Sequence, residues 1–256
     1  MKLNSKLKRI AWAVGVLLFW IALWQILAIA VSNRLIVPFP ADVVIRLFEL
    51  ILTSDFWIFW LMSLIRVSLG LIISIPAALI MASISARLRI VEKLFSPAVT
   101  LMKSIPVVSF ILIAIFVIDR NAIPSLITFL MIFPVLYENI REGITQTPQS
   151  LLEMAKVFEM PVLIKIKRIY FPSVKPYFFT ALCTSVGLAL KAGIAAEVVA
   201  YIPDSIGKML SDAKSYMEPA DLFAWTAVIL ISSIILEKTT RYLSSLAIKN
   251  RRSDCD

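Results

Sequence analysis

Residues 10–33, IAWAVGVLLFWIALWQILAIAVSN, form a run of 24 residues without one charged side chain. An α-helix rises 1.5 Å per residue, so about 20 apolar residues are enough to cross the hydrocarbon core of a membrane. A cleaved signal peptide is the alternative, because a basic segment precedes the run and Ala28-Ile29-Ala30 resembles a cleavage site. The run is longer than the roughly 7–15 apolar residues of a signal sequence, so we predict a permanent first transmembrane helix.

The rest of the chain contains further runs of this kind. Uncharged runs occupy residues 67–86, 104–118, 122–137, 177–190 and 222–236. Several are short, but they lengthen if the flanking Arg66, Lys103 or Lys191 reaches the headgroups or faces protein. The composition agrees, since 60% of the residues are hydrophobic and only 17% are charged, against about 25% charged in soluble proteins. We predict an all-α membrane protein with about six transmembrane helices in a single domain, residues 1–256, and exclude a soluble enzyme.

Several residue types that carry out chemistry are missing from the sequence. There is no histidine, which excludes Ser–His catalysis and His-built metal sites. The two cysteines, Cys183 and Cys255, lie in such different settings that we expect no disulfide. Gly207-Lys208 is followed by Met209 instead of Ser or Thr, which excludes a phosphate-binding loop. We therefore expect no catalytic residue, no metal site and no cofactor, and any ATP would be hydrolysed by another subunit.

The Lys and Arg residues lie mostly on one side of the predicted membrane topology. With the N-terminus inside, 18 of the 26 basic residues fall in cytoplasmic segments. The largest group lies between the fourth and fifth helices, in residues 138–175, and the tail contributes Arg251 and Arg252 among others. We expect both termini in the cytoplasm, and topology explains the formal charge of +9 without a nucleic-acid partner.

The basic loop 138–175 also contains a predicted amphipathic helix. Ser150-Leu151-Leu152-Glu153 matches a capping box, in which Ser150 and Glu153 satisfy the first amides of a helix. Leu151, Met154 and Phe158 then share one face at helical spacing, and Pro161 ends or redirects the helix. Such a helix either lies on the headgroups or inserts its apolar face into a groove of a cytoplasmic partner.

The same loop resembles the inner-membrane permeases of ABC importers. Their pattern is Glu-Ala-Ala, three residues, Gly, nine residues and Ile-x-Leu-Pro. Here Glu153-Met154-Ala155 is followed after three residues by Glu159, and after nine more by Ile169-Tyr170-Phe171-Pro172. In that family this segment is the coupling helix, which docks in a cleft of the ATPase subunit. The resemblance assigns residues 149–172 as a cytoplasmic coupling segment. Its ATPase-docking residues would be Glu153, Met154, Ala155, Phe158, Glu159 and Pro172.

One departure from the family pattern bears on the geometry of the loop. Glu159 stands where the family has Gly, a residue suited to a left-handed turn. A non-glycine residue costs roughly 1–2 kcal/mol in that conformation, and Pro161 offers another way to end the helix.

Other stretches resemble the branch of this family that imports nitrate, aliphatic sulfonates, taurine and some vitamin precursors. These stretches are Pro38-Phe39-Pro40, Ser63-Leu64-Ile65-Arg66-Val67 with Gly70, Ser104-Ile105-Pro106, Ala195-Ala196-Glu197 and Ser205-Ile206-Gly207. The resemblance implies the type I ABC importer fold and a pathway for a small, anionic solute. It also implies that two copies of the permease form a homodimer in the plasma (inner) membrane. Its partners would be two ATPase subunits and an extracytoplasmic binding protein.

Two charged residues in the fifth predicted helix are candidates for the translocation path or gate. Lys191 lies fourteen residues after Tyr177, or about 21 Å along a helix, a depth at which a charge costs perhaps 2.5–3.5 kcal/mol. It either attracts an anion or reaches the outer headgroups. Glu197 lies on another face of the helix, and we expect it at the outer mouth, where it contacts a binding protein or closes a gate. For Arg66 we expect a headgroup anchor.

Two other classes of function remain open at this point. A secondary transporter or channel predicts several ionisable residues in mid-span or an inverted repeat, and we find only Lys191 and no convincing repeat. A membrane scaffold protein would share the basic loop without needing the spacing of the coupling pattern.

Overall fold

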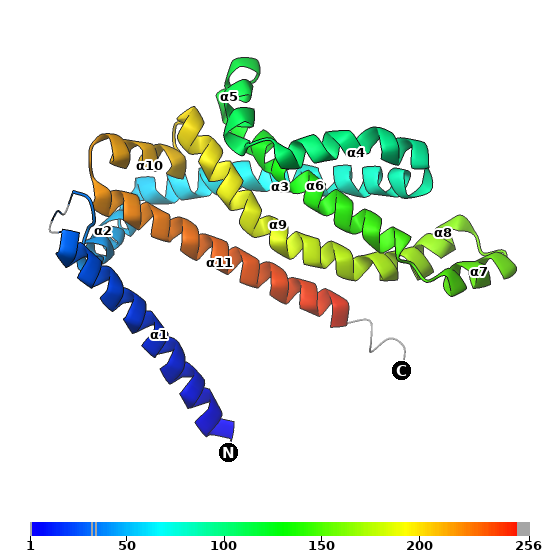
Figure 1. Cartoon of the computed structure of the whole chain (residues 1–256), viewed down its shortest axis with the longest axis horizontal. Coiled ribbons are helices and arrows are strands. Elements are labelled where there is room, and N and C mark those ends of the chain that lie inside the picture. Colours follow the sequence, from blue (N-terminus) through cyan, green and yellow to red (C-terminus); the bar gives the residue numbers. More distant parts are fainter. Residues whose placement is uncertain (1, 32, 34, 250–256) are drawn as a thin grey trace.

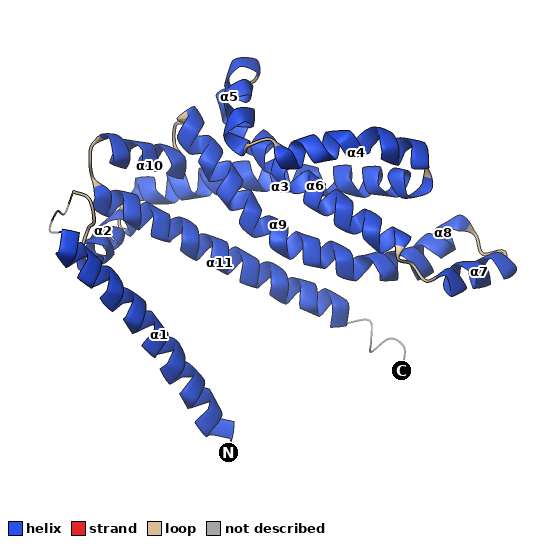
Figure 2. Ribbon diagram, viewed as in Figure 1, coloured by secondary structure: helices blue, strands red, loops and turns tan. Residues whose placement is uncertain are grey.

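The computed structural model describes residues 2–31, 33 and 35–249, and these residues are helical almost throughout, with no strand among them (Figures 1 and 2). The elements are α1 (Lys2–Val31), α2 (Pro40–Ile51), α3 (Ser54–Arg87), α4 (Arg89–Ser104), α5 (Val107–Val117), the 3-10 turn η1 (Arg120–Ala122), α6 (Ile123–Thr145), α7 (Gln149–Val157), α8 (Val162–Lys165), the π turn η2 (Ile166–Tyr170), α9 (Phe171–Ala200), α10 (Ile206–Ser215) and α11 (Pro219–Lys249). Arg251, Arg252 and Cys255 lie outside the described residues.

Five helical stretches among the described residues are long and apolar enough to cross a membrane. They are Val14–Val31, Ser54–Arg87, Arg120–Thr145, Val162–Ala200 and Pro219–Leu246, and a bent pair of helices makes a sixth if it is counted as one span. The predicted all-α membrane fold with about six spans is confirmed.

The third predicted span, residues 104–118, is not a single straight helix. α4 and α5 meet at an angle of 102° across a break at Ile105 and Pro106. Proline lacks an amide hydrogen and disfavours helical geometry in the residue before it. Ile105 accordingly has extended angles, φ −76° and ψ 131°. With 11 residues, α5 is too short to span a membrane alone.

The core lies where α6 packs against α3 and α9. Its fully buried side chains include Ile132, Leu136, Ile140 and Leu190. Small residues allow the helices to approach closely, as is usual between membrane helices. A Cβ on Gly193 of α9 would lie only 2.5 Å from the Cγ2 atom of Val67 on α3.

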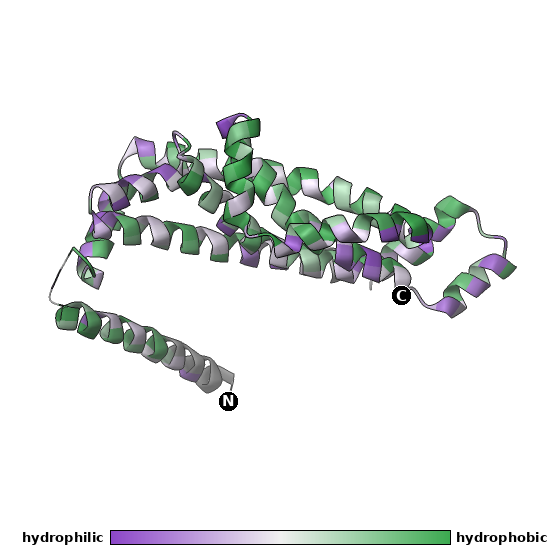
Figure 3. Ribbon diagram, turned by 45° about the horizontal axis from the view of Figure 1, so that its top comes forward, coloured by the Kyte–Doolittle hydropathy of each residue, from purple (hydrophilic) through white to green (hydrophobic). Residues whose placement is uncertain are grey.

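The bundle has two distinct ends (Figure 1). α7 and α8 project from one end, and α10 lies at the other; we call these the α7 end and the α10 end. α1 stands apart from the bundle over most of its length, although Trp24 stacks on Phe223 of α11 with ring centroids 5.5 Å apart. Figure 3 shows that the long helices are mostly hydrophobic and that hydrophilic residues gather at α7 and α10. This distribution fits a bundle whose middle lies in a membrane.

Candidate functional site

α7 begins two residues earlier than the capping-box pattern predicts. Its N-cap is Pro148, whose carbonyl oxygen accepts hydrogen bonds from the amides of Leu151 and Leu152 at 3.1 and 3.4 Å. Ser150 therefore lies inside the first turn and makes no capping bond, so the predicted capping box of Ser150 and Glu153 is wrong. The helix starts at Gln149 because Pro148 has a fixed φ of −56° and an extended ψ of 128°.

The end of α7 keeps the left-handed turn for which the family uses glycine. Glu159 has a φ of 47°. The Met160 amide donates to the Ala155 carbonyl at 2.9 Å, and the Glu159 amide donates to the Lys156 carbonyl at 3.1 Å. These two bonds define a Schellman motif, which satisfies the last carbonyls of a helix. The chain thus forms the turn despite the steric cost of a side chain at Glu159, and Pro161 follows as the N-cap of α8.

α7 and its C-cap expose apolar side chains among polar ones. Met154 is 43% exposed, Val157 79% and Phe158 74%, whereas Ala155 is 1% exposed and packs inside the chain. Glu153 and Glu159 are exposed. Of the predicted docking residues, only Ala155 and the half-buried Pro172 are thus withdrawn from the surface.

Pro172 lies in the first turn of α9, but helical structure begins before it. α8, the π turn η2 and α9 follow one another without a break, so the helical stretch runs from Val162 to Ala200. The missing amide of Pro172 interrupts normal helical hydrogen bonding, and the π turn lies directly before it at Ile166–Tyr170.

A cluster of polar residues is buried near the α10 end. Glu197 of α9 is fully buried, and its Oε2 atom accepts hydrogen bonds from the Ser63 hydroxyl at 2.7 Å and the Gly207 amide at 3.2 Å. Its Oε1 atom lies 3.6 Å from the Arg66 guanidinium. We call Ser63, Arg66, Glu197, Ser205 and Gly207 the Glu197 cluster.

This cluster holds the first turn of α10. The Ile206 amide donates to the Ser63 hydroxyl at 3.0 Å, and the Lys208 amide donates to the Ser205 hydroxyl at 3.0 Å. The Gly207 amide donates to Glu197 in the same way. Side chains thus accept hydrogen bonds from three of the amides that have no partner within the first turn of α10. The carboxylate also lies at the positive end of the α10 dipole, where a negative charge is favoured. Glu197 therefore joins α9 to α10 and is not at the chain surface.

Arg66 does not act as a simple headgroup anchor, so that prediction is wrong. Its guanidinium donates to the carbonyl oxygens of Pro203 and Asp204 at 3.3 and 3.2 Å, and to Asn121 Oδ1 at 3.3 Å. Only 14% of its side chain is exposed. Arg66 thus links α3 to the segments before α6 and α10. The hydropathy of the sequence cannot reveal this contact.

Lys191 lies on a different face of α9 from Glu197. It is exposed, and among the described residues it takes part in no hydrogen bond or ion pair. The expectation that the two charges are not partners is therefore confirmed. No group of three or more acidic or Cys residues that could hold a metal ion occurs in the part of the chain that the structure describes.

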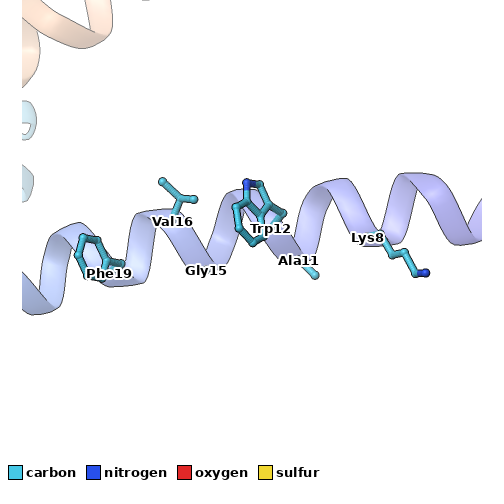
Figure 4. A pocket seen from close by; sticks show the side chains of 6 residues that line it. All are labelled: Lys8, Ala11, Trp12, Gly15, Val16 and Phe19. Carbon is cyan, nitrogen blue, oxygen red and sulfur yellow. The ribbon is translucent and has the colours of Figure 1, made fainter.

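Two of the hollows on the described residues bear on a candidate site. The larger, about 690 Å³, is lined only by α1 residues, which Figure 4 shows along one helix. Because a single helix lines it, it is an open side of α1 and not an enclosed site. The smaller, about 330 Å³, is lined by Asn139 of α6 and by Pro176, Tyr177 and Thr180 of α9.

Known proteins are similar to this chain in sequence along most of its length. The sequence profile of the family described as "Binding-protein-dependent transport system inner membrane component" matches residues 74–241. The chain is 25% identical to a Bacillus subtilis protein named as an aliphatic sulfonates transport permease, SsuC, over 96% of this chain and 90% of that protein. It is also 25% identical to the bicarbonate transport system permease protein CmpB of Synechococcus elongatus, over 97% and 93% of the two chains. Identity to the nitrate import permease protein NrtB of the same organism is 27%, over 77% and 74%.

The profile covers more than half of the chain, and the three matches extend over 90%, 93% and 74% of the relatives' own lengths. The chain is thus a multi-pass membrane protein of a family of transport components. The resemblance that rests on the loop around Glu153 is confirmed, and the chain belongs to the binding-protein-dependent transport system inner membrane components, the permease subunits of ABC importers.

Proposed function

We propose that this chain is the permease subunit that lines the pathway for a small anion in an ABC importer. The three relatives described above are named for aliphatic sulfonates, bicarbonate and nitrate, which are all small oxyanions. The chain itself carries out no bond chemistry, and a separate ATPase subunit hydrolyses ATP.

The exposed apolar face of α7 carries this proposal. Met154, Val157 and Phe158 project from a short helix whose far end is held by the Schellman motif at Glu159. An exposed apolar face on a rigid helix matches the way in which amphipathic helices insert into a groove of a partner. The ATPase subunit docks on this face, and residues 149–172 act as the coupling segment.

The α7 end is the cytoplasmic end in this proposal. The basic residues of the loop around α7 favour that side, and both termini lie on it. Two ATPase subunits serve two permease copies, as the resemblance to ABC importer permeases implies. An extracytoplasmic binding protein delivers the solute at the α10 end.

Transport follows from relative motion of the two ends. ATP binding brings the ATPase subunits together and moves the α7 segments, which tilts the helices and opens the pathway outward. The Glu197 cluster makes α3, α9 and α10 move as one block at the outer gate, because its carboxylate holds groups from all three helices.

Co-purification with the ATPase tests this proposal. Met154→Asp or Phe158→Asp should abolish ATPase binding and solute-stimulated ATP hydrolysis while leaving the amount of folded permease unchanged. Tyr216→Asp is the matched control, since Tyr216 is 74% exposed at the α10 end. Full ATPase binding by the α7 variants would disprove docking at α7.

A further inference from the structure

α9 carries a row of polar side chains on its exposed side. Thr180, Thr184 and Lys191 are exposed and Tyr177 is half-buried. At 100° per residue these four positions lie within about 60° of one another around the helix axis. We call Tyr177, Thr180, Thr184 and Lys191 the α9 stripe.

The rest of α9 at this depth is buried inside the chain. Ala189, Leu190, Ala192 and Gly193 are all withdrawn from the surface. The helix therefore presents its polar side outward and its apolar side inward, which is the reverse of a helix that faces lipid. An unpaired ammonium in mid-membrane costs perhaps 2.5–3.5 kcal/mol, so Lys191 faces water or another protein.

Lys191 is the only cation of the stripe. The Thr180 hydroxyl donates to the Pro176 carbonyl at 2.9 Å, and the Thr184 hydroxyl donates to the Ala181 carbonyl at 2.8 Å. Both threonine residues remain exposed, which keeps the surface wettable. The ammonium group is the donor available to an anion.

The stripe ends at the smaller hollow. Thr180 and Tyr177 line this space of about 330 Å³ together with Asn139 of α6. Thr180 precedes Lys191 by eleven residues, or about 16 Å of helix in the direction of the α7 end. Polar side chains thus recur along this side of α9 from Lys191 to the hollow, with the buried Gly187 between Thr184 and Lys191.

A carboxylate from α11 reaches this side of α9 at Gly187. A Cβ built on Gly187 would lie 1.9 Å from Oε1 of Glu237, so the carboxylate occupies the space that any side chain at Gly187 would fill. Gly187 lies between Thr184 and Lys191, one helical turn before the lysine. Glu237 and Lys191 form no ion pair among the described residues, although Glu237 accepts a 3.5 Å hydrogen bond from Ser233.

We propose that the α9 stripe faces the solute and that Lys191 binds a small oxyanion there. The carboxylate of Glu237, which packs against Gly187, limits how tightly the anion is held. This inference rests on the proposed function, since it assumes that the chain lines a pathway. A transport site must bind its ion strongly enough to admit it and weakly enough to release it. The ammonium group of Lys191 attracts the anion. The carboxylate of Glu237, one helical turn toward the α7 end, weakens this attraction and favours release.

Transport by the complete importer gives the first test. The permease is reconstituted with its ATPase and binding protein, and ATP-dependent uptake of ethanesulfonate, nitrate and bicarbonate is measured. Lys191→Met should reduce uptake of the transported anion at least about tenfold, the loss expected for one charged hydrogen bond, while Lys191→Arg retains most of it. Glu237→Gln should lower both KM and the maximal rate, because release becomes slower. Lys93→Met, which removes an exposed charge from α4, is the control. An unchanged rate for Lys191→Met would overturn the inference.

Thiol labelling gives a second test that does not need transport. In the full chain with Cys183 and Cys255 replaced by Ser, Thr184→Cys is treated with an anionic sulfonate-bearing or a cationic ammonium-bearing methanethiosulfonate. It should react much faster than Leu17→Cys on α1, and Lys191→Met should lower the ratio of anionic to cationic rates, whereas Glu237→Gln raises it. Equal rates at Thr184→Cys and Leu17→Cys, or a ratio insensitive to Lys191→Met, would overturn the inference. If the wild type imports none of the three anions but labelling behaves as expected, the proposed substrate class fails and the water-facing stripe stands.

Discussion

The carboxylate of Glu197 accepts a hydrogen bond from the amide of Gly207, 3.2 Å away, and so closes the hairpin between α9 and α10. The two residues are ten positions apart. The turn between them includes Tyr201 and Asp204, which both have positive φ values, 50° and 49°. A Cβ at Gly207 would lie 2.2 Å from Cβ of Glu197, so this approach depends on the glycine.

Gly207→Ala should therefore destabilise the α10 end. The added methyl group would also meet the main-chain carbon of Glu197 at 2.6 Å, and backbone cannot move aside cheaply. We expect a loss of about 1–3 kcal/mol in the free energy of unfolding, the usual cost of overpacking. Thermal unfolding of the purified protein measures it. Gly15→Ala is the control, because nothing lies within 4 Å of a Cβ there. Equal melting temperatures for the two variants would contradict the contact.

Glu197→Ala should be more harmful than Glu197→Gln. Alanine leaves the Ser63 hydroxyl and the Gly207 amide without their acceptor and the Arg66 guanidinium without its ion-pair partner, and removing one partner of a buried ion pair costs about 3–5 kcal/mol. Glutamine retains a carbonyl oxygen for Ser63 and Gly207 and loses only the charge. The yield of folded protein and its melting temperature rank the variants. Two equally damaging variants would mean that the charge, not the hydrogen bonding, dominates.

Glu159→Gly should stabilise the end of α7. Glu159 has a φ of 47°, and glycine adopts this region without the steric cost of about 1–2 kcal/mol. Slower proteolysis between α7 and α8 measures the gain. Lys156→Gly in the same helix is the matched control, and it should act in the opposite direction by about 0.5–1 kcal/mol, because its position is helical. Faster cleavage of Glu159→Gly would show that the left-handed turn carries no strain.

Tyr201 should ionise at a higher pH than a free tyrosine. Its hydroxyl donates to Asp212 Oδ1 at 2.5 Å, and this hydrogen bond to a carboxylate raises the pKa of Tyr201 above its usual value near 10. Because the folded-state pKa is raised, the contact stabilises the fold below pH 10 and is lost as the pH rises through the folded-state pKa. Asp212→Asn should lower this pKa again. Ultraviolet titration of phenolate absorbance follows it, with Tyr201→Phe to assign the signal.

Local patterns in the sequence predict most of the helices but not their breaks and joins. The uncharged runs are recognised because burial in lipid requires them. Pro106 in the sequence indicates a possible helix break, but hydropathy alone predicts one span over residues 104–118. The structure has a break at Ile105 and Pro106 instead. The capping box at Ser150 failed for a similar reason, since Pro148 starts the helix two residues earlier.

The candidate site divides in the same way. The spacing from Glu153 to Pro172 identified the coupling segment, because a docking helix is a local element with a local signature. Ser63, Arg66 and Glu197 each stand in a family-like motif, but the motifs do not reveal that they meet, as Ser63 and Glu197 are 134 residues apart. Glu237 gave no signal at all, and its importance follows only from its position over Gly187.

The sequence by itself determined that this chain is a helical membrane permease, because hydropathy, the distribution of basic residues and one loop pattern are all properties of contiguous segments. Only the tertiary structure decided which charges are buried and paired and which remain exposed. Glu197 is enclosed by donors from α3 and α10, whereas Lys191, six residues before it, is exposed and unpaired among the described residues. The free energy of a charge in a membrane depends on what surrounds it in three dimensions, and neighbours along the chain do not supply that environment.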